Sequence, residues 1–338
     1  MTLRKKILGI ISMTIISLIL ILYVISRIII LESFVSLEEQ YTRQHVERVL
    51  SALSDELAEL NNTVSDWAQW DDTYAFIEEP YDDYVKKNLI DSTFINLRLN
   101  LMLFVHSSGR IVFSKVFDLQ NEQEIPVPES LQEHLADNSL LLSHPDPESS
   151  LTGIMLLPEN PMLVASWPIL TSEKKGPIRG TLIMGRYLDS AEVERLAKIT
   201  HLSLTVSRFN NLQLPPEFQK AQVSLSAEVP IVTQQLSETS IAGYGLINDL
   251  YDKPSLIVRV DIPREIYKRG QVSTLYFVAL LLIISLGLGM MILVLIEKMV
   301  LSRVAQLNMS VKNIRTNSDL STRVSVAGKR RMAVGSGE

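Results

Sequence analysis

Two long apolar runs dominate the hydrophobic pattern of this 338-residue chain. Residues 275–296 contain no charged side chain, and residues 7–31 contain only Arg27. A helix needs about 20 mostly apolar residues to cross the roughly 30 Å of hydrocarbon in a membrane. Inside lipid, a single segment satisfies its backbone polar groups only as a helix. We therefore predict two membrane-spanning helices, with residues 32–274 between them on one side of the membrane.

Basic residues flank both runs and orient them. Arg4, Lys5 and Lys6 precede the first run, which is longer than the apolar core of a cleaved signal peptide, so we expect it to be retained. The basic residues after the second run are Lys298, Arg303, Lys312, Arg315, Arg323, Lys329, Arg330 and Arg331. Positively charged loops stay in the cytoplasm. Residues 1–6 and 297–338 are therefore expected inside the cell.

After the first run, apolar residues recur at alternating steps of four and three. The set is Val46, Leu50, Leu53, Leu57, Leu60, Val64 and Trp67. This spacing predicts a long helix with one apolar seam. The seam packs either on the chain's own sheet or on a second copy of the chain. The pattern slightly favours a homodimer through the membrane-proximal helices.

Short strand-like runs and turn residues fill the rest of the outer segment. The runs are Leu101–His106, Ile111–Phe117, Leu151–Leu157, Met162–Leu170, Ile178–Leu188, Leu202–Ser207, Ile241–Ile247 and Leu256–Ile262. Gly109 lies in a hairpin turn between the first two, and residues 151–188 predict an antiparallel meander. Asp189 or Ser190 is expected to cap a helix that ends near Ile199. Helices mixed with antiparallel strands make the fold class α+β.

Composition excludes several kinds of function. The net charge is −6 although both ends are basic, so the outer segment is strongly acidic and unsuited to nucleic acid. The chain has no cysteine, and its five histidines form no metal-binding motif. We expect no enzyme in this chain, no cofactor and no bound metal. An outer domain of this size without disulfides fits a bacterial periplasm.

A cluster of aromatic and acidic residues is the candidate ligand site. Trp67 and Trp70 share one helical face, and Asp71 lies one heptad step from Trp67. With Asp72 and Tyr74 they either anchor the long helix to the sheet or line a pocket for a small cation or amine. Arg186, on a predicted strand, is either a surface residue or a pocket residue for a carboxylate.

The residues from Leu53 to Ser207 resemble the fourth class of CHASE extracellular sensor domains. The resemblance rests on the run Trp67-Ala-Gln-Trp70-Asp-Asp-Thr-Tyr74, then Tyr84-Val85, Asn88-Leu89, the hairpin at Gly109 and Gly180–Arg186. It implies a PAS/Cache-like periplasmic sensor domain between two membrane helices. Such domains precede diguanylate cyclases, cyclic-di-GMP phosphodiesterases and histidine kinases.

The residues after the second run resemble the start of a HAMP linker. Val300, Val304, Leu307, Val311 and Ile314 repeat the heptad, and the connector-like stretch Asp319–Val324 and Gly328 follow. In place of the family's second amphipathic helix, the sequence continues as residues 329–338, so the linker in 297–338 is incomplete.

The sequence therefore predicts a receptor fragment of a bacterial inner membrane, with a periplasmic domain at residues 32–274. That domain senses an unknown small periplasmic ligand and passes the signal through the second membrane helix to an output, expected to be cyclic-di-GMP turnover, that this chain lacks. The alternative is a membrane-anchored scaffold whose outer domain docks another protein without a small ligand.

Overall fold

The computed structural model describes residues 3–135, 139–211, 213–296 and 298. The chain divides into two compact units. The helix unit comprises Met1–Val35 and Ile266–Glu338, and the globular unit comprises Ser36–Glu265. All but one residue of the predicted HAMP segment, residues 297–338, lies outside the described residues.

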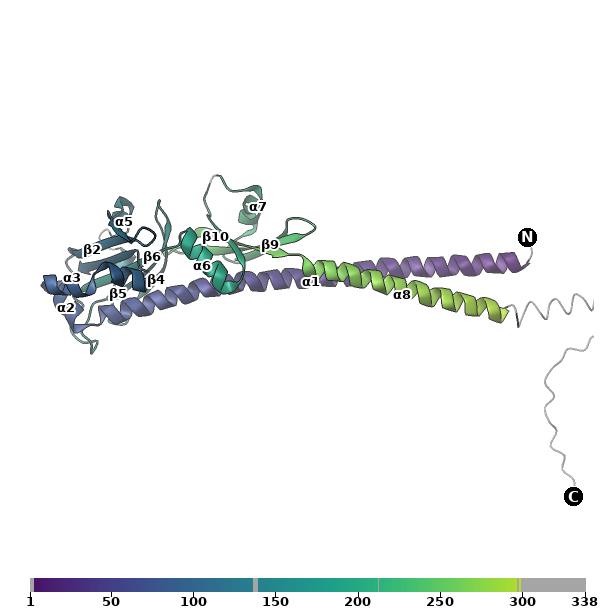
Figure 1. The fold of residues 1–338 in the computed structure, drawn as a ribbon, viewed down its shortest axis with the longest axis horizontal. Coiled ribbons are helices and arrows are strands. Elements are labelled where there is room, and N and C mark those ends of the chain that lie inside the picture. The colour runs from purple at the N-terminus through teal and green to yellow at the C-terminus, as the bar shows by residue number, and fades with distance from the viewer. Residues whose placement is uncertain (1–2, 136–138, 212, 297, 299–338) are drawn as a thin grey trace, which may run out of the picture. The chain divides into compact units, whose positions relative to one another are not determined.

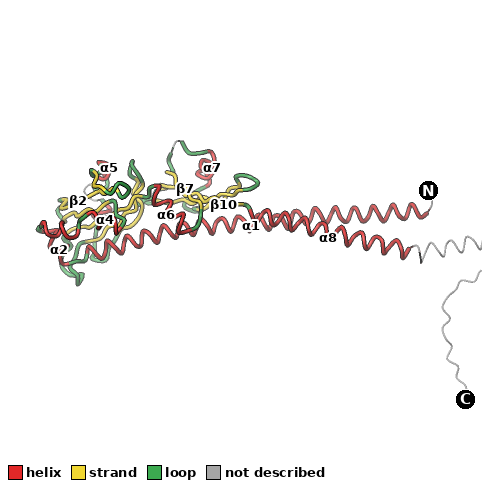
Figure 2. Tube along the Cα trace, viewed as in Figure 1, coloured by secondary structure: helices red, strands yellow, loops and turns green. Residues whose placement is uncertain are grey.

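The helix unit contains the start of α1 (Leu3–Ala68) and nearly all of α8 (Glu265–Ile296), which lie side by side (Figures 1 and 2). Both helices are long and apolar enough to cross a membrane. Most of their apolar side chains are exposed, as suits helices in contact with lipid. A Cβ on Gly270 would come within 2.6 Å of the Phe34 ring, and one on Gly289 within 2.7 Å of Ile15. The two glycines therefore permit close approach of the helices.

The first sheet of the globular unit has six antiparallel strands in the order β3-β2-β1-β6-β5-β4. The strands are β1 (Leu101–His106), β2 (Ile111–Asp118), β3 (Gln123–Ile125), β4 (Leu151–Leu156), β5 (Pro161–Pro168) and β6 (Gly180–Tyr187). The predicted hairpin joins β1 and β2, with Gly109 at a φ of 82° that suits glycine. The predicted meander is β4-β5-β6.

The second sheet has four antiparallel strands in the order β7-β10-β9-β8. They are β7 (Ser203–Arg208), β8 (Ile231–Gln235), β9 (Ser240–Asn248) and β10 (Pro254–Pro263). Two helices accompany them, α6 (Ser190–Thr200) and α7 (Pro216–Ser224). The predicted cap of α6 is present, because the Asp189 carboxylate accepts the Glu192 N–H.

Side chains alternate between the two faces of the first sheet. Met102 and Phe104 of β1 pack with α1, while Leu101, Leu103 and Val105 pack on the opposite side. Helices α2 (Asp71–Glu78), α3 (Asp82–Asn88) and α4 (Asp91–Leu97) complete the first face, and α5 (Glu129–Glu133) and the 3₁₀ turn Leu140–Leu142 complete the second. The confirmed class is α+β, with antiparallel sheets and a long N-terminal helix.

The apolar seam of α1 packs on both sheets. Figure 1 shows the helix running along them. Val46 lies against the second sheet, and Leu60 and Val64 against the first, each at most 1% exposed. Gly243 and Gly245 of β9 admit the helix, since a Cβ there would come within 2.5 and 2.8 Å of Val46. Of the two partners considered for this seam, the described residues show the chain's own sheets. A homodimer through the membrane-proximal helices stays a prediction.

A buried ion pair ties α1 to the end of β10. The Arg264 guanidinium donates to Glu38 Oε2 at 2.8 Å, and the two side chains are 3% and 2% exposed. Removing one partner of such a pair destabilises the protein, because the other charge stays buried without a counter-charge. It fixes the position of α1 against the second sheet.

We expect Val64→Ala to lower the free energy of unfolding of the globular unit by about 2 kcal/mol, because the substitution leaves a cavity under α1. The matched control is Val223→Ala on α7, where the side chain is 88% exposed and the change should be within about 0.5 kcal/mol. Urea unfolding of the chain in detergent, followed by tryptophan fluorescence, measures both. Equal effects of the two substitutions would contradict the packing of α1 on the first sheet.

Candidate functional site

A cleft of about 420 Å³ opens where three strands of the first sheet meet. Because β1 runs antiparallel to β2 and β6, the residues before β1 lie beside the ends of both neighbours. The loop after β3 and the turn between β4 and β5 close the cleft. Its lining is Asn100, Asp118, Leu119, Gln120, Ile125, Pro126, Val127, Pro128, Glu159, Asn160, Tyr187 and Asp189. We call it the first-sheet cleft; its volume is within the range of small-molecule sites.

The charged residues that line the first-sheet cleft are all acidic. Internal hydrogen bonds fix two of the three carboxylates. Asp118 accepts the Gln120 and Asn121 N–H groups and the Asn121 amide, at 2.7 to 3.1 Å. The Asn121 side chain, followed by the two backbone N–H groups, holds the pKa of Asp118 below its ordinary value. Asp189 caps α6 with one oxygen and accepts the Gln120 amide at 3.3 Å with the other.

Tyr187 and Glu159 are two cleft residues whose side chains have capacity left to bind a ligand. Glu159 accepts the Ser130 hydroxyl at 3.0 Å through one oxygen. The Tyr187 hydroxyl makes no hydrogen bond within the described part of the chain, while its backbone N–H donates to Asn100 at 2.9 Å. Burial, and then the nearby Glu159, raise the pKa of Tyr187, which keeps its hydroxyl protonated. The arrangement suits a small molecule that has a cationic or N–H donor group and an apolar part. The apolar part would contact the proline loop, which we define as Pro126–Pro128 after β3.

The predicted aromatic site lies elsewhere, at the end of α1 and the start of α2. The Trp67 and Trp70 rings stack with centroids 5.0 Å apart, and Trp70 is 40% exposed. Asp71 accepts the Ser172 N–H at 2.9 Å, while its own N–H donates to the Ser172 hydroxyl at 3.2 Å. Asp72 is exposed.

Tyr74 contacts the turn before β6. Its hydroxyl donates to the Pro177 carbonyl at 3.3 Å, and the Arg179 guanidinium lies 3.8 Å from the centre of its ring. These contacts fasten α2 to the turn between β5 and β6. Of the six predicted site residues, the structure brings these five together and places none in the lining of the first-sheet cleft.

Arg186 is 3% exposed, so the expectation of a surface residue is wrong. Its Nη1 donates to Glu56 Oε2 at 2.6 Å, its Nε to the Arg98 carbonyl at 2.9 Å and its Nη2 to the Leu97 carbonyl at 3.1 Å. The partners come from α1 and the end of α4. Arg186 binds its own chain here, one residue before Tyr187 of the cleft.

Glu56 is the centre of an ion-pair cluster that the sequence did not predict. Three guanidinium groups approach its carboxylate: Arg98 at 3.1 Å, Arg186 at 2.6 Å and Arg195 in a short contact. Glu192 contacts Arg195 at 2.7 Å and Arg98 at 3.7 Å. Only the Glu192–Arg195 pair, three apart on one helix, has a local signal in sequence. We call the set Glu56, Glu59, Arg98, Arg186, Glu192 and Arg195 the Glu56 cluster.

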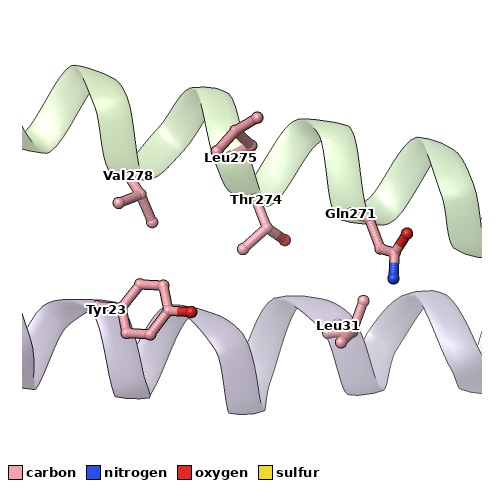
Figure 3. Close-up of a pocket in the computed structure, with 6 residues that line it drawn as sticks. All are labelled: Tyr23, Leu31, Gln271, Thr274, Leu275 and Val278. Carbon is pink, nitrogen blue, oxygen red and sulfur yellow. The ribbon is translucent and has the colours of Figure 1, made fainter.

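Other hollows lie outside the first-sheet cleft. A cleft of about 740 Å³ runs along the edge strand β7 beside α6, where Glu194 pairs with Lys198 and Arg208 donates to two backbone carbonyls. In the helix unit, a pocket of about 210 Å³ lies between α1 and α8. Figure 3 shows Tyr23 of α1 facing Thr274 and Val278 of α8. No group of three or more acidic or histidine residues suits a metal ion within the described residues.

The family model of the CHASE4 domain matches residues 52–207. A curated relative, the methanogenesis regulatory histidine kinase FilI of Methanothrix harundinacea (strain 6Ac), is 33% identical over 315 residues. The match covers 93% of this chain and 35% of that protein, so this chain spans about a third of the relative's length.

Similar solved structures include extracellular and periplasmic domains of several bacterial proteins. The extracellular domain of vpHK1S-Z8 has a TM-score of 0.46 at 12% identity, covering 70% of this chain and 96% of its own. The periplasmic domain of Vibrio cholerae LuxQ has a TM-score of 0.42 at 12% identity, and the match covers 66% of this chain and 99% of that domain. The periplasmic sensory domain of the Campylobacter jejuni chemoreceptor Tlp1 has a TM-score of 0.35 at 12% identity, and the match covers 69% of this chain and 98% of that domain.

We expect Glu56→Gln to remove a pH-dependent part of the stability. Burial alone would raise the pKa of Glu56, but the hydrogen bond from Arg195 and the charges of Arg195, Arg98 and Arg186 hold the pKa below its ordinary value. A carboxylate with a depressed folded pKa stabilises fully above its unfolded pKa and loses that contribution as the pH falls through the folded pKa. Wild type should therefore be more stable than Glu56→Gln at pH 6, and the difference should shrink towards pH 3.

Thermal unfolding midpoints between pH 6 and pH 3 measure this difference. Glu47→Gln, exposed on the same helix, is the control and should follow the wild type. A Glu56→Gln difference that stays constant with pH would contradict the role of the ionised carboxylate.

Proposed function

We propose that this chain is the sensing and membrane-spanning part of a receptor, because residues 52–207 match the family model of the CHASE4 domain. The globular unit binds a small molecule outside the cytoplasm, and α1 and α8 carry the resulting change across the membrane. Two helices that are each long and apolar enough to span a bilayer support this arrangement. Basic residues precede the apolar run of α1 and follow that of α8 in the sequence, which favours a cytoplasmic location for both termini.

The first-sheet cleft is the observation that carries the ligand-binding proposal. It combines a protonated Tyr187 hydroxyl, a half-used Glu159 carboxylate and an apolar proline loop in a volume that suits a small molecule. Since its charged residues are all acidic, the class of ligand that fits is a small organic amine. The sequence also predicted a small cation or amine as the ligand, but placed its site at the tryptophan–aspartate run, Trp67–Tyr74.

A histidine kinase is the output that the relative supports. FilI, which matches most of this chain, is named as a methanogenesis regulatory histidine kinase. We therefore propose a kinase-type output in place of the cyclic-di-GMP turnover expected from sequence. Binding then shifts the population of two arrangements of the membrane helices.

We expect a small amine to stabilise the chain in a thermal-shift screen against amines, amino acids, organic acids and divalent ions. A ligand at about 100 times its dissociation constant adds about 2.7 kcal/mol. Glu159→Gln and Tyr187→Phe should weaken binding about tenfold each, because each removes one polar contact of roughly 1.4 kcal/mol. Asp72→Asn and Trp70→Ala should leave the affinity unchanged.

Loss of binding in Asp72→Asn but not in Glu159→Gln would instead assign the ligand to the tryptophan–aspartate run. A screen without any hit would favour the scaffold function, in which the globular unit docks another protein.

We expect single-cysteine variants to report an outward-facing globular unit. The absence of native cysteine makes such labelling specific. A membrane-impermeant maleimide should label Ser226→Cys, which is exposed in the globular unit, in intact cells. It should label Lys6→Cys, near the start of α1, only after lysis. The reverse pattern would place the globular unit in the cytosol and remove the receptor function.

A further inference from the structure

The Glu56 cluster joins the membrane-directed helix to the two elements that border the first-sheet cleft. Glu56 and Glu59 belong to α1, Arg186 to β6, and Glu192 and Arg195 to α6. Arg98 follows α4 and adds the fourth segment. Charged contacts between these segments therefore meet at one carboxylate, which is only 7% exposed.

Stability alone does not explain this cluster. Replacing buried ion pairs with well-packed apolar residues is often neutral or stabilising. Arg98, the C-cap of α4, also has a φ of 55°, a left-handed conformation that costs a non-glycine residue about 1 kcal/mol or more. Before and after Glu56 on α1, the seam residues Leu53 and Leu60 already pack in the apolar core. A charged contact differs from this packing because it depends on direction and breaks when its partners move.

The cleft lies next to two of the cluster's contacts. Arg186 immediately precedes Tyr187, whose side chain lines the cleft. Asp189, also in the lining, caps α6 and is followed about one turn later by Glu192 and nearly two turns later by Arg195. A ligand that contacts Tyr187 acts on β6, and one that displaces the Gln120–Asp189 hydrogen bond acts on the start of α6. These are two of the three segments whose arginines hold Glu56.

On the other side of the cluster, α1 continues without interruption from Leu3 to Ala68. A helix with intact backbone hydrogen bonds transmits a displacement or rotation along its length. Movement of Glu56 against the first sheet is therefore movement of the segment that enters the membrane.

We propose that Glu56 is the positioning residue through which the sensor domain sets the position of α1. In one state its carboxylate is held by Arg186 and Arg195 together; in the other, one of these contacts is released and α1 shifts. The proposal rests on the proposed receptor function, but it concerns α1 and not the identity of the ligand. Glu56→Gln, which keeps the shape and removes the charge, should favour the released state without any ligand.

The experiment uses the full chain in lipid nanodiscs with pairs of spin labels and measures distances by double electron–electron resonance. One pair, Ala58→Cys on α1 and Glu194→Cys on α6, reports on the cluster. A second pair, Lys6→Cys and Leu295→Cys, reports on α1 and α8 at their opposite ends from the globular unit. In Glu56→Gln both distance distributions should shift by on the order of 1–2 Å or gain a second population. Glu47→Gln, exposed on the same helix, should match the wild type in both pairs.

A Glu56→Gln chain that is less stable than wild type but has unchanged distances in the second pair would overturn the proposal, because the cluster would then be structural only. Glu56→Asp, which keeps the charge, should restore the wild-type distributions at least in part. If Glu56→Gln does not fold, Arg195→Gln at the more exposed side of the cluster takes its place, with the same two outcomes. None of these measurements uses a ligand, so failure of the amine screen or of the labelling experiment remains a separate result.

Discussion

The packing of a single helix against two sheets is the constraint on which this structure depends. Each sheet buries one face against α1 and the other against short helices. Neither sheet has another long element on the α1 side, so the seam from Val46 to Val64 forms part of both cores. The glycines of β9 show how closely the helix approaches, since even a methyl group at Gly243 would meet Val46. Apolar packing of this kind keeps the helix in contact with the sheets but depends little on its exact register. The charged contacts, which depend on direction, define that register.

Two sets of charges fix α1 along its length. Near the start of the globular unit, Glu38 pairs with Arg264, immediately before α8. Further along, Glu56 meets arginines from β6 and α6. The apolar seam lies largely between and around these points, so α1 has a defined register on both sheets. Buried charges that lose a partner are costly, which makes each set sensitive to small displacements.

Local features of the fold were predictable from sequence, whereas the sites were not. The hairpin at Gly109, the meander and the Asp189 cap follow from turn chemistry and alternation within a few residues. The partner of the α1 seam was not predictable, because the same heptad suits a sheet or a second helix. Arg186 looked like a surface residue because its four protein partners are up to 130 positions away in sequence. The first-sheet cleft joins Asn100, Asp118, Glu159 and Tyr187, which only strand pairing brings together.

The unbroken course of α1 also fixes the direction in which the side chains of its apolar first part point relative to those of its seam. Each residue of an α-helix turns the chain by about 100°, so inserting one residue between Ser36 and His45 would rotate the seam away from its sheets or turn the apolar first part of α1 by that angle. Insertions of seven residues nearly restore the original direction. The length of this stretch, and not only its composition, is therefore part of what the protein specifies, and variation in it should occur in multiples that preserve the helical face.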